Sequence, residues 1–184
     1  MIKVEAVNSS IERAAKLLNG VPKGFEQALV SSLNRALLEG RTAGTREATK
    51  RYTVRAGIIR KTMAMHRASK SNLEAELVSR GRRLPLKQFK HKPVTDTTGA
   101  KRKQVSVAVR QGTLKPLGQG FIYRGMVMQR LGSNRLPIEQ KFSISVPNVL
   151  NNEEIVDAIQ ERMGQSVEKR IAHETERILA GYGK

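Results

Sequence analysis

Residues 25–61 read FEQALVSSLNRALLEGRTAGTREATKRYTVRAGIIRK, and the rest of the predicted fold is organised around this segment. Apolar side chains recur in its first half at three- and four-residue spacing, which places them on one stripe of a helix. They are Phe25, Ala28, Leu29, Leu33, Ala36 and Leu37. A weaker apolar trace continues through Ala43 and Ala48 to Tyr52. The pattern predicts a long helix to about Tyr52 that buries one of its sides.

The second half of this stretch is basic on its remaining faces. Between residues 41 and 61, seven of the eight charged side chains are basic, and Glu47 is the single acid. The basic side chains are Arg41, Arg46, Lys50, Arg51, Arg55, Arg60 and Lys61. An ordinary solvated helix face mixes charges of both signs, so this imbalance favours attraction to phosphate or to an acidic protein surface.

The composition limits the class of protein. At 184 residues the chain is long enough for one domain, residues 1–184, with a sizeable core. Only 4% of the residues are aromatic and none is Trp, so the core is expected to be aliphatic. The absence of Cys excludes disulfides and Cys-based zinc sites. Without a signal-peptide pattern or a run of about 18 apolar residues, we expect a soluble protein made in a cytoplasm.

The net charge of +18 is unevenly distributed along the chain. Residues 1–40 hold five basic and four acidic side chains, and residues 151–184 hold five basic and seven acidic ones. The excess positive charge therefore lies in the middle of the chain. A field of this size indicates a polyanion or an acidic protein nearby, so the middle is expected to be the contact region.

Two shorter helices flank the long one in the first third of the chain, so helices are expected over residues 9–61. Residues 9–19 carry an apolar face and follow Ser9 or Ser10, either of which is a suitable N-cap. Residues 53–60 predict a turn and a short helix with Thr53 as its cap.

The carboxyl-terminal segment predicts a second long helix, from about residue 151 to residue 180. Asn151 or Asn152 is expected to cap it, and Gly181 and Gly183 are expected to end it. Its apolar stripe consists of Ile155, Ala158, Ile159, Met163, Val167, Ile171, Thr175 and Ile178.

Between the helices, several short segments alternate apolar and polar side chains with the period of a strand. They are residues 63–67, 72–79, 105–110, 118–124, 126–131 and 142–146. A tight link at Gly125 is expected to join two of them, and Pro147 is expected to stop the last. The predicted fold class is α+β, with the two long helices packed on one curved antiparallel sheet of about four to six strands over residues 63–146.

A second basic stretch lies within the predicted sheet region. Nine basic residues and one acid, Asp96, occur between Arg80 and Lys103. The candidate contact residues here are Arg82, Arg83, Lys101, Arg102 and Lys103. We expect residues 82–103 to form a basic loop that is mobile until a partner binds.

The sequence offers little for catalysis. The three histidines, His66, His91 and His173, lack metal-ligand spacing, and no Ser or Thr lies in a nucleophile motif. The acids at residues 153–157 suit the positive end of a helix dipole. Residues 118–120, Gly-Gln-Gly, lack the rest of a phosphate-binding loop and indicate a sharp turn. We therefore expect no enzyme activity, no metal and no cofactor.

Without catalytic residues, the chain is expected either to assemble with other proteins or to bind nucleic acid. Tyr52 and Phe89 are the only aromatic residues in the basic stretches, and no zinc-finger, basic-zipper or ribonucleoprotein motif is present. DNA contact, if made, is expected at the backbone and without sequence preference. This leaves a free-standing, sequence-independent DNA-binding module as the alternative. A hydrolase or nuclease dependent on the histidines ranks last.

Several segments, in this order, resemble the phage minor tail protein Z family, the tail completion proteins of long-tailed non-contractile phages. The resemblance covers roughly residues 25–180. Its segments are Ser32-Leu33-Asn34-Arg35-Ala36, Arg41-Thr42-Ala43 with Arg46, Tyr52 to Lys61, Gly81-Arg82-Arg83-Leu84-Pro85-Leu86, Phe121-Ile122, Arg135-Leu136-Pro137-Ile138-Glu139, Ser145 to Leu150, and the closing charged helix.

The resemblance implies a structural virion protein at the head-proximal end, or neck, of the tail. Such a protein would be made in the host cytoplasm and join a ring, a hexamer if it matches the tail tube. It would complete the tail and enable head–tail joining. The implied partners are other copies of itself, a tail terminator or tail tube protein, head–tail connector proteins and, by backbone contacts, the end of the phage DNA.

Overall fold

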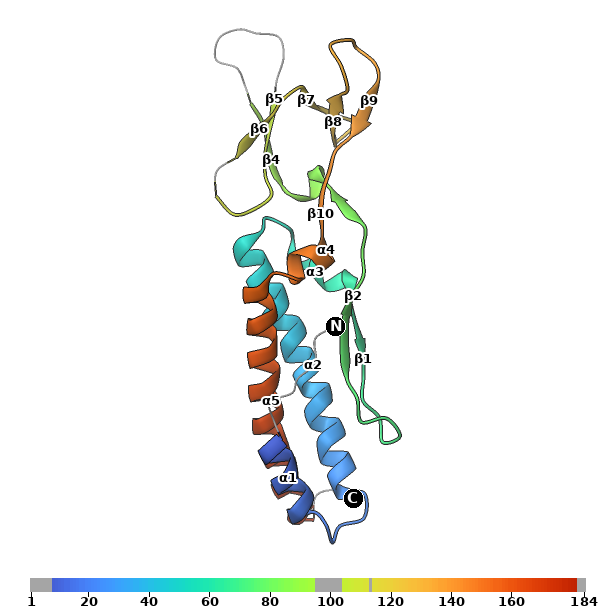
Figure 1. Cartoon of the computed structure of the whole chain (residues 1–184), viewed down its shortest axis with the longest axis vertical. Helices are drawn as coiled ribbons and strands as arrows, with labels where there is room; N and C mark the ends of the chain where they lie inside the picture. Colours follow the sequence, from blue (N-terminus) through green and yellow to red (C-terminus); the bar gives the residue numbers. More distant parts are fainter. Residues whose placement is uncertain (1–7, 95–103, 113, 182–184) are drawn as a thin grey trace. The chain divides into compact units, whose positions relative to one another are not determined.

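The computed structural model describes residues 8–94, 104–112 and 114–181, and its helices and antiparallel strands confirm the α+β class (Figure 1). The chain divides into two compact units built from discontinuous segments. Unit 1 comprises residues 1–45, 63–79 and 151–184, and unit 2 comprises residues 46–62 and 80–150.

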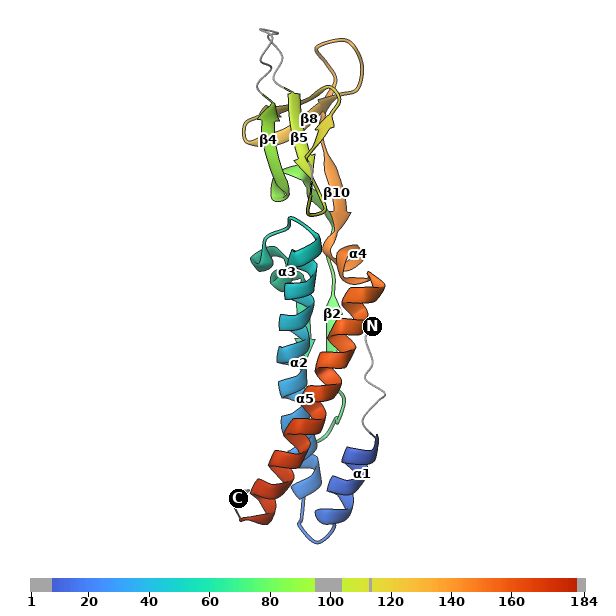
Figure 2. The same cartoon turned by 90° about the vertical axis from the view of Figure 1, so that its left-hand side faces the viewer.

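Unit 1 is an assembly of helices with one β-hairpin. Its elements are α1 (Asn8–Leu17), most of α2 (Gly24–Arg51), β1 (Met63–His66), β2 (Glu76–Ser79) and α5 (Glu153–Leu179). The two long helices predicted from the sequence are thereby confirmed. They run side by side in both views, with α1 against α5 (Figures 1 and 2).

The contact between α2 and α5 depends on two glycines one helical turn apart. A Cβ atom at Gly40 would lie 2.6 Å from both Cγ and Sδ of Met163, and one at Gly44 would lie 2.7 Å from Cδ1 of Ile159. Real Cβ atoms do not approach other heavy atoms so closely, so only glycine fits these positions without a shift. The order of the contacts also shows that the two helices run antiparallel.

Where α1 packs against α2 and α5, the core of unit 1 is largely aliphatic, as the composition predicts. Ala14 of α1 packs with Leu29 and Ile171, and Leu18 packs with Ala28 and Ile178 in a neighbouring cluster. Phe25 is partly buried against both clusters. The predicted apolar stripes of the three helices therefore meet one another.

The β1–β2 hairpin confirms the first predicted strand pair and is tied to α2 by a side-chain amide. Asn34 Nδ2 donates to the carbonyl of Ala68 at 3.0 Å, and the Ala68 N–H donates to Asn34 Oδ1 at 2.9 Å. Both backbone polar groups of Ala68 are thus satisfied by one side chain. Met63 and Leu77 provide the buried side chains of the hairpin.

Unit 2 begins with the last residues of α2 and contains most of the strands. Its elements are α3 (Ala56–Thr62), β3 (Arg83–Pro85), the 3-10 helix η1 (Leu86–Gln88), β4 (Lys90–Val94), β5 (Gln104–Ala108), β6 (Lys115–Leu117), β7 (Gly120–Tyr123), β8 (Met126–Arg130), β9 (Ile138–Gln140), β10 (Phe142–Ser145) and α4 (Val146–Leu150). They form three antiparallel sheets, ordered β10–β3, β4–β5–β6 and β7–β8–β9.

The prediction of one curved sheet is wrong, because the strands are divided among small separate sheets. Proline explains part of this division: Pro85 lies in β3, Pro93 in β4 and Pro116 in β6. Proline has no N–H to donate to a further strand, and these three strands are all edges of their sheets. The β4–β5–β6 sheet therefore has a proline-containing strand at each edge.

The hairpin predicted around Gly125 is confirmed. Phe121 pairs with Met128, and the two-residue turn has positive φ at both Arg124 (48°) and Gly125 (71°). Two consecutive left-handed residues form the turn whose twist matches that of paired strands.

Two local predictions in unit 2 are wrong. Val146 and Pro147 do not end a strand but begin α4, where proline is tolerated because the first helical N–H groups have no partner within the helix. Thr53 does not cap the following helix, which begins at Ala56. Its hydroxyl donates instead to the carbonyl of Ala108 in β5.

The predicted basic loop, residues 82–103, is largely regular where the structure describes it. Residues 83–94 form β3, η1 and β4, and β4 pairs with β5 from Lys90↔Ala108 to Val94↔Gln104. This pairing satisfies backbone groups that a loop would leave to water. Residues 95–103, with the candidates Lys101, Arg102 and Lys103, lie outside the described residues.

We expect Gly40→Val to lower the free energy of unfolding by about 1–3 kcal/mol, because the added methyls would displace Met163 from its packed position. The matched control is Gly164→Ala in α5, where a Cβ meets no atom within 4 Å. That change is expected to add about 1 kcal/mol through helix propensity. Urea denaturation followed by circular dichroism measures both. Equal effects of the two changes would contradict the close approach at Gly40.

Candidate polyanion interface

The excess of positive over negative charge lies entirely in the sequence of one unit. Unit 2 holds 21 of the 34 Lys and Arg residues but three of the 16 Asp and Glu residues. Unit 1 holds the remaining 13 basic and 13 acidic residues and is formally neutral. The whole net charge of +18 therefore belongs to unit 2, which is where a polyanion would bind.

Within unit 2, a backbone hydrogen bond brings the basic residues at the end of α3 close to those of residues 80–83. The N–H of Arg80 donates to the carbonyl of Thr62 at 3.0 Å, and a Cβ atom at Gly81 would lie 3.3 Å from Cγ2 of Thr62, so the last turn of α3 lies beside residues 80–83. The basic residues of these two segments are all exposed, and we call them the α3–β3 basic surface: Arg60, Lys61, Arg80, Arg82 and Arg83. Arg55 is exposed at the opposite end of α3.

A helix terminus explains part of this surface without any ligand. Arg60 and Lys61 occupy the last turn of α3, where the partial negative charge of the helix favours basic side chains. That effect falls off within one turn and does not account for Arg80, Arg82 and Arg83, which precede or begin β3. The helix dipole therefore accounts for two of the five side chains of this surface.

The basic side chains predicted on α2 do not share one surface. Arg46 and Lys50 are exposed and four residues apart, but Lys50 Nζ contacts Glu47 Oε1 at 2.6 Å. Arg41 and Arg51 are only partly exposed, and Arg41 belongs to unit 1. The helix therefore contributes less to the interface than the charge pattern predicts.

The structure reveals aromatic residues beside arginine that the sequence did not point to. The guanidinium carbon of Arg130 lies 4.6 Å from the ring centre of Phe121, and that of Arg124 lies 5.3 Å from the ring centre of Tyr123. Both rings lie outside the two basic stretches, whose only aromatic residues are Tyr52 and Phe89. The alternation of Phe121 and Tyr123 in a predicted strand was the available signal.

An apolar hollow of about 720 Å³ also lies within unit 2. It is lined mainly by aliphatic side chains from β5, β6 and β10, with Tyr52 of the segment after α2. Arg110, Lys115 and Gln111 are its polar lining residues on the β5–β6 side. The lining contains no pair of groups suited to acid–base chemistry.

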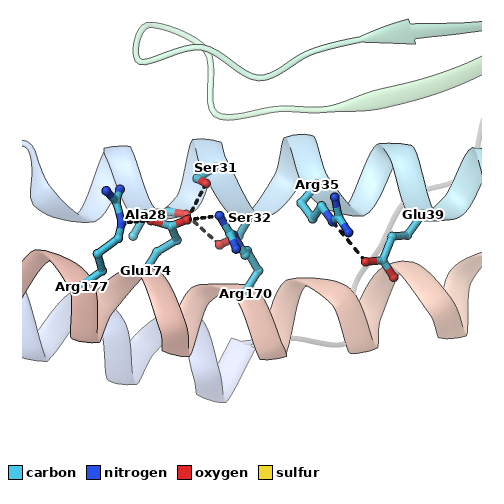
Figure 3. A network of polar contacts seen from close by, with 8 residues as sticks. All are labelled: Ala28, Ser31, Ser32, Arg35, Glu39, Arg170, Glu174 and Arg177. Atoms are coloured by element: carbon cyan, nitrogen blue, oxygen red, sulfur yellow. Dashed lines mark hydrogen bonds and ion pairs between the residues drawn. The ribbon is translucent and has the colours of Figure 1, made fainter. Parts of the chain in front are cut away.

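Unit 1 contains a buried charged cluster, centred on Glu174, whose side chains converge from α2 and α5 (Figure 3). Glu174 is 1% exposed. It accepts a hydrogen bond from Ser31 Oγ at 2.9 Å and contacts Arg170 at 2.7 Å and Arg177 at 2.8 Å. The hydrogen bond from Ser31 links α2 to α5, whereas Arg170 and Arg177 pair with the carboxylate from within α5.

The pKa of Glu174 reflects two opposing effects. Burial raises it, because a charged carboxylate loses hydration. Hydrogen bonds from Ser31 and Arg177, together with the charges of Arg170 and Arg177, lower it by more. The pKa of Glu174 therefore lies below that of an ordinary glutamate.

The three histidines are not part of a common site. His66 in β1 and His173 in α5 are exposed, and His91 in β4 has Nδ1 at 2.9 Å from the carbonyl oxygen of Phe89. Among residues 8–94, 104–112 and 114–181, no group of three or more His, Cys, Asp or Glu side chains could hold a metal ion. Over the same residues, no helix combines the length and apolar character needed to cross a bilayer.

Comparison of the chain with protein-family models, with curated proteins and with solved structures gave no match. The function must therefore be inferred from the charge distribution and the geometry of unit 2.

We expect Glu174→Gln to lower the free energy of unfolding by about 1–3 kcal/mol at neutral pH, because the amide cannot replace the ionic contacts. A lowered pKa in the folded state stabilises the protein above the unfolded pKa, and this stabilisation is lost as the pH falls through the folded pKa. The difference between parent and variant is therefore expected to shrink on acidification.

Urea midpoints measured from neutral pH to below the ordinary glutamate pKa of about 4.3 test this. The control is Glu176→Gln, an exposed glutamate on the same helix. A difference at Glu174 that stays constant across the whole pH range would show that its charge does not stabilise the fold.

Proposed function

We propose that this protein is a structural subunit of the head-proximal end of a phage tail. It forms a ring with other copies, completes the tail, enables head–tail joining, and contacts the DNA backbone without base preference. The observation that carries the proposal is the segregation of charge: a neutral unit 1 and a unit 2 of net charge +18 in one chain.

Segregated charge suits a subunit that must make two kinds of contact. A neutral unit with paired charges, such as Glu39 with Arg35 and Arg162, packs against protein without strong repulsion. A strongly basic unit attracts phosphate and releases the counterions around it. In a ring, the basic units of all copies add their fields, so a passing DNA would meet a continuous positive potential.

Exposed apolar side chains in unit 2 also support assembly with other proteins of the tail. Leu131 is 59% exposed, Leu136 is 67% exposed and Phe142 is 50% exposed. They lie between β8 and β9 and at the start of β10, next to sheet edges that could pair with another chain. Apolar groups beside open edges are typical of surfaces that become buried on association.

The same charge supports a second function, a free-standing and sequence-independent DNA-binding module. An isolated monomer would then bind DNA with nanomolar affinity and a steep dependence on salt. The tail-completion proposal instead expects weak binding by the monomer and strong binding by the ring. Sedimentation and DNA titration of one preparation separate the two functions.

The charge-reversal test replaces Arg60, Lys61, Arg82 and Arg83 of the α3–β3 basic surface with Glu. We expect this variant to lose head joining in extracts that lack the tail completion protein. We also expect its DNA affinity to fall, with a salt slope that drops by about 0.9 for each phosphate that the variant no longer neutralises. Infectious particles and salt-dependent DNA affinity are measured in parallel.

The matched control replaces four exposed basic residues of unit 1 with Glu, namely Lys16, Arg67, Lys70 and Lys169. Its change in net charge is the same, so it isolates the effect of position. We expect it to retain head joining. Equal loss in both variants, or retention in both, would rule out the α3–β3 basic surface as the functional contact.

A further inference from the structure

One face of the β7–β8–β9 sheet combines aromatic, methionine and arginine side chains. The register pairs Phe121 with Met128, Tyr123 with Met126, and Arg130 with Ile138. Residues paired across antiparallel strands lie on the same face, as do alternate residues of one strand. These six side chains therefore share a face, while Val127, 1% exposed, belongs to the opposite one.

The aromatic rings on this face are spaced like a stacking platform. Phe121 and Tyr123 are two residues apart on one strand, which separates them by about 6.6 Å along it. Tyr123 is 46% exposed, and Phe121 is partly exposed. The guanidinium groups of Arg130 and Arg124 lie over these rings, so each ring is extended by a flat cationic group on which a base can also stack.

The positive charge of the β7–β8–β9 face favours an anionic partner. Its paired positions between β7 and β9 carry no acidic side chain, since Glu139 alternates to the opposite face. Another copy of unit 2 would bring a further net charge of +18 against it. A partner that is both anionic and rich in flat apolar surfaces fits better, and unpaired nucleotides have both properties.

We propose that the β7–β8–β9 face binds single-stranded nucleic acid, with bases stacked on the exposed parts of Phe121 and Tyr123 and on the guanidinium groups of Arg124 and Arg130 that lie over these rings. A duplex hides the faces of its bases, so it cannot use these rings. The proposal does not require the virion role, and it adds a base-stacking contact to the backbone contacts expected of the α3–β3 basic surface.

The test compares the purified full chain with a variant carrying Phe121→Leu and Tyr123→Leu. Leucine keeps apolar volume on the face but removes the π surface. We expect affinity for a short oligothymidine to fall about tenfold or more, since stacking on an aromatic side chain stabilises each bound base. Affinity for a duplex of the same length is expected to stay unchanged, as is the salt slope, because the variant keeps every basic side chain.

The matched control is Ile122→Ala, an exposed residue between the two aromatics that alternates to the other face. It is expected to leave both affinities unchanged. Tyrosine emission provides a direct readout because the chain has no Trp. Oligothymidine is expected to quench the parent, and the quenching is expected to be largely abolished in the single variant Tyr123→Leu.

Three results would overturn the proposal. The first is an oligothymidine affinity that does not change in the double variant. The second is a parent protein that does not prefer single strand to duplex. The third is a double variant whose oligomeric state changes while its affinity for oligothymidine does not. The last result would assign the face to contacts between copies. If the charge-reversal variant retains head joining, all three measurements remain interpretable, so this proposal and the virion role can fail separately.

Discussion

The close approach of α2 and α5 at Gly40 and Gly44 is the contact on which the rest of unit 1 depends. Removing two Cβ atoms lets Ile159 and Met163 pack directly against the α2 backbone, so a chain with few aromatic residues can still form a dense core. The buried Glu174 then links the same two helices through Ser31, and α1 packs against α5 with small aliphatic groups.

The division of charge follows from how acids are distributed over the two units. In unit 1, acids and bases are equal in number, and several are paired in the structure, as Glu39 is with Arg162. In unit 2, three acids cannot neutralise 21 basic side chains, so counterions or a polyanion must do so. Self-repulsion in the free protein is thus converted into affinity when phosphate is bound. The composition of unit 2 therefore favours anion binding both at the α3–β3 basic surface and at the β7–β8–β9 face.

Local sequence predicted the long helices well and the sheets poorly. The apolar spacing in residues 25–52 and 151–180 repeats over many turns, so the helices could be recognised without any knowledge of their neighbours. The pairing of β3 with β10, by contrast, joins residues about 60 positions apart, and no local pattern reports such a partner. The role of Thr53 was missed for the same reason, since its hydroxyl bonds to Ala108. The prolines could be read from the sequence, but their effect on the number of sheets depends on which strands pair in the folded chain.

Local patterns were sufficient to predict the α+β class and the two long helices, and the composition gave the net charge and the candidate basic residues. The folded chain was needed to show that Arg60 and Lys61 lie beside Arg80, Arg82 and Arg83, while Arg41 and Arg51 are partly buried. It also placed arginine over Phe121 and Tyr123. Helix periodicity and charge are properties of neighbouring residues, whereas a surface is defined by contacts between residues that are distant in the chain.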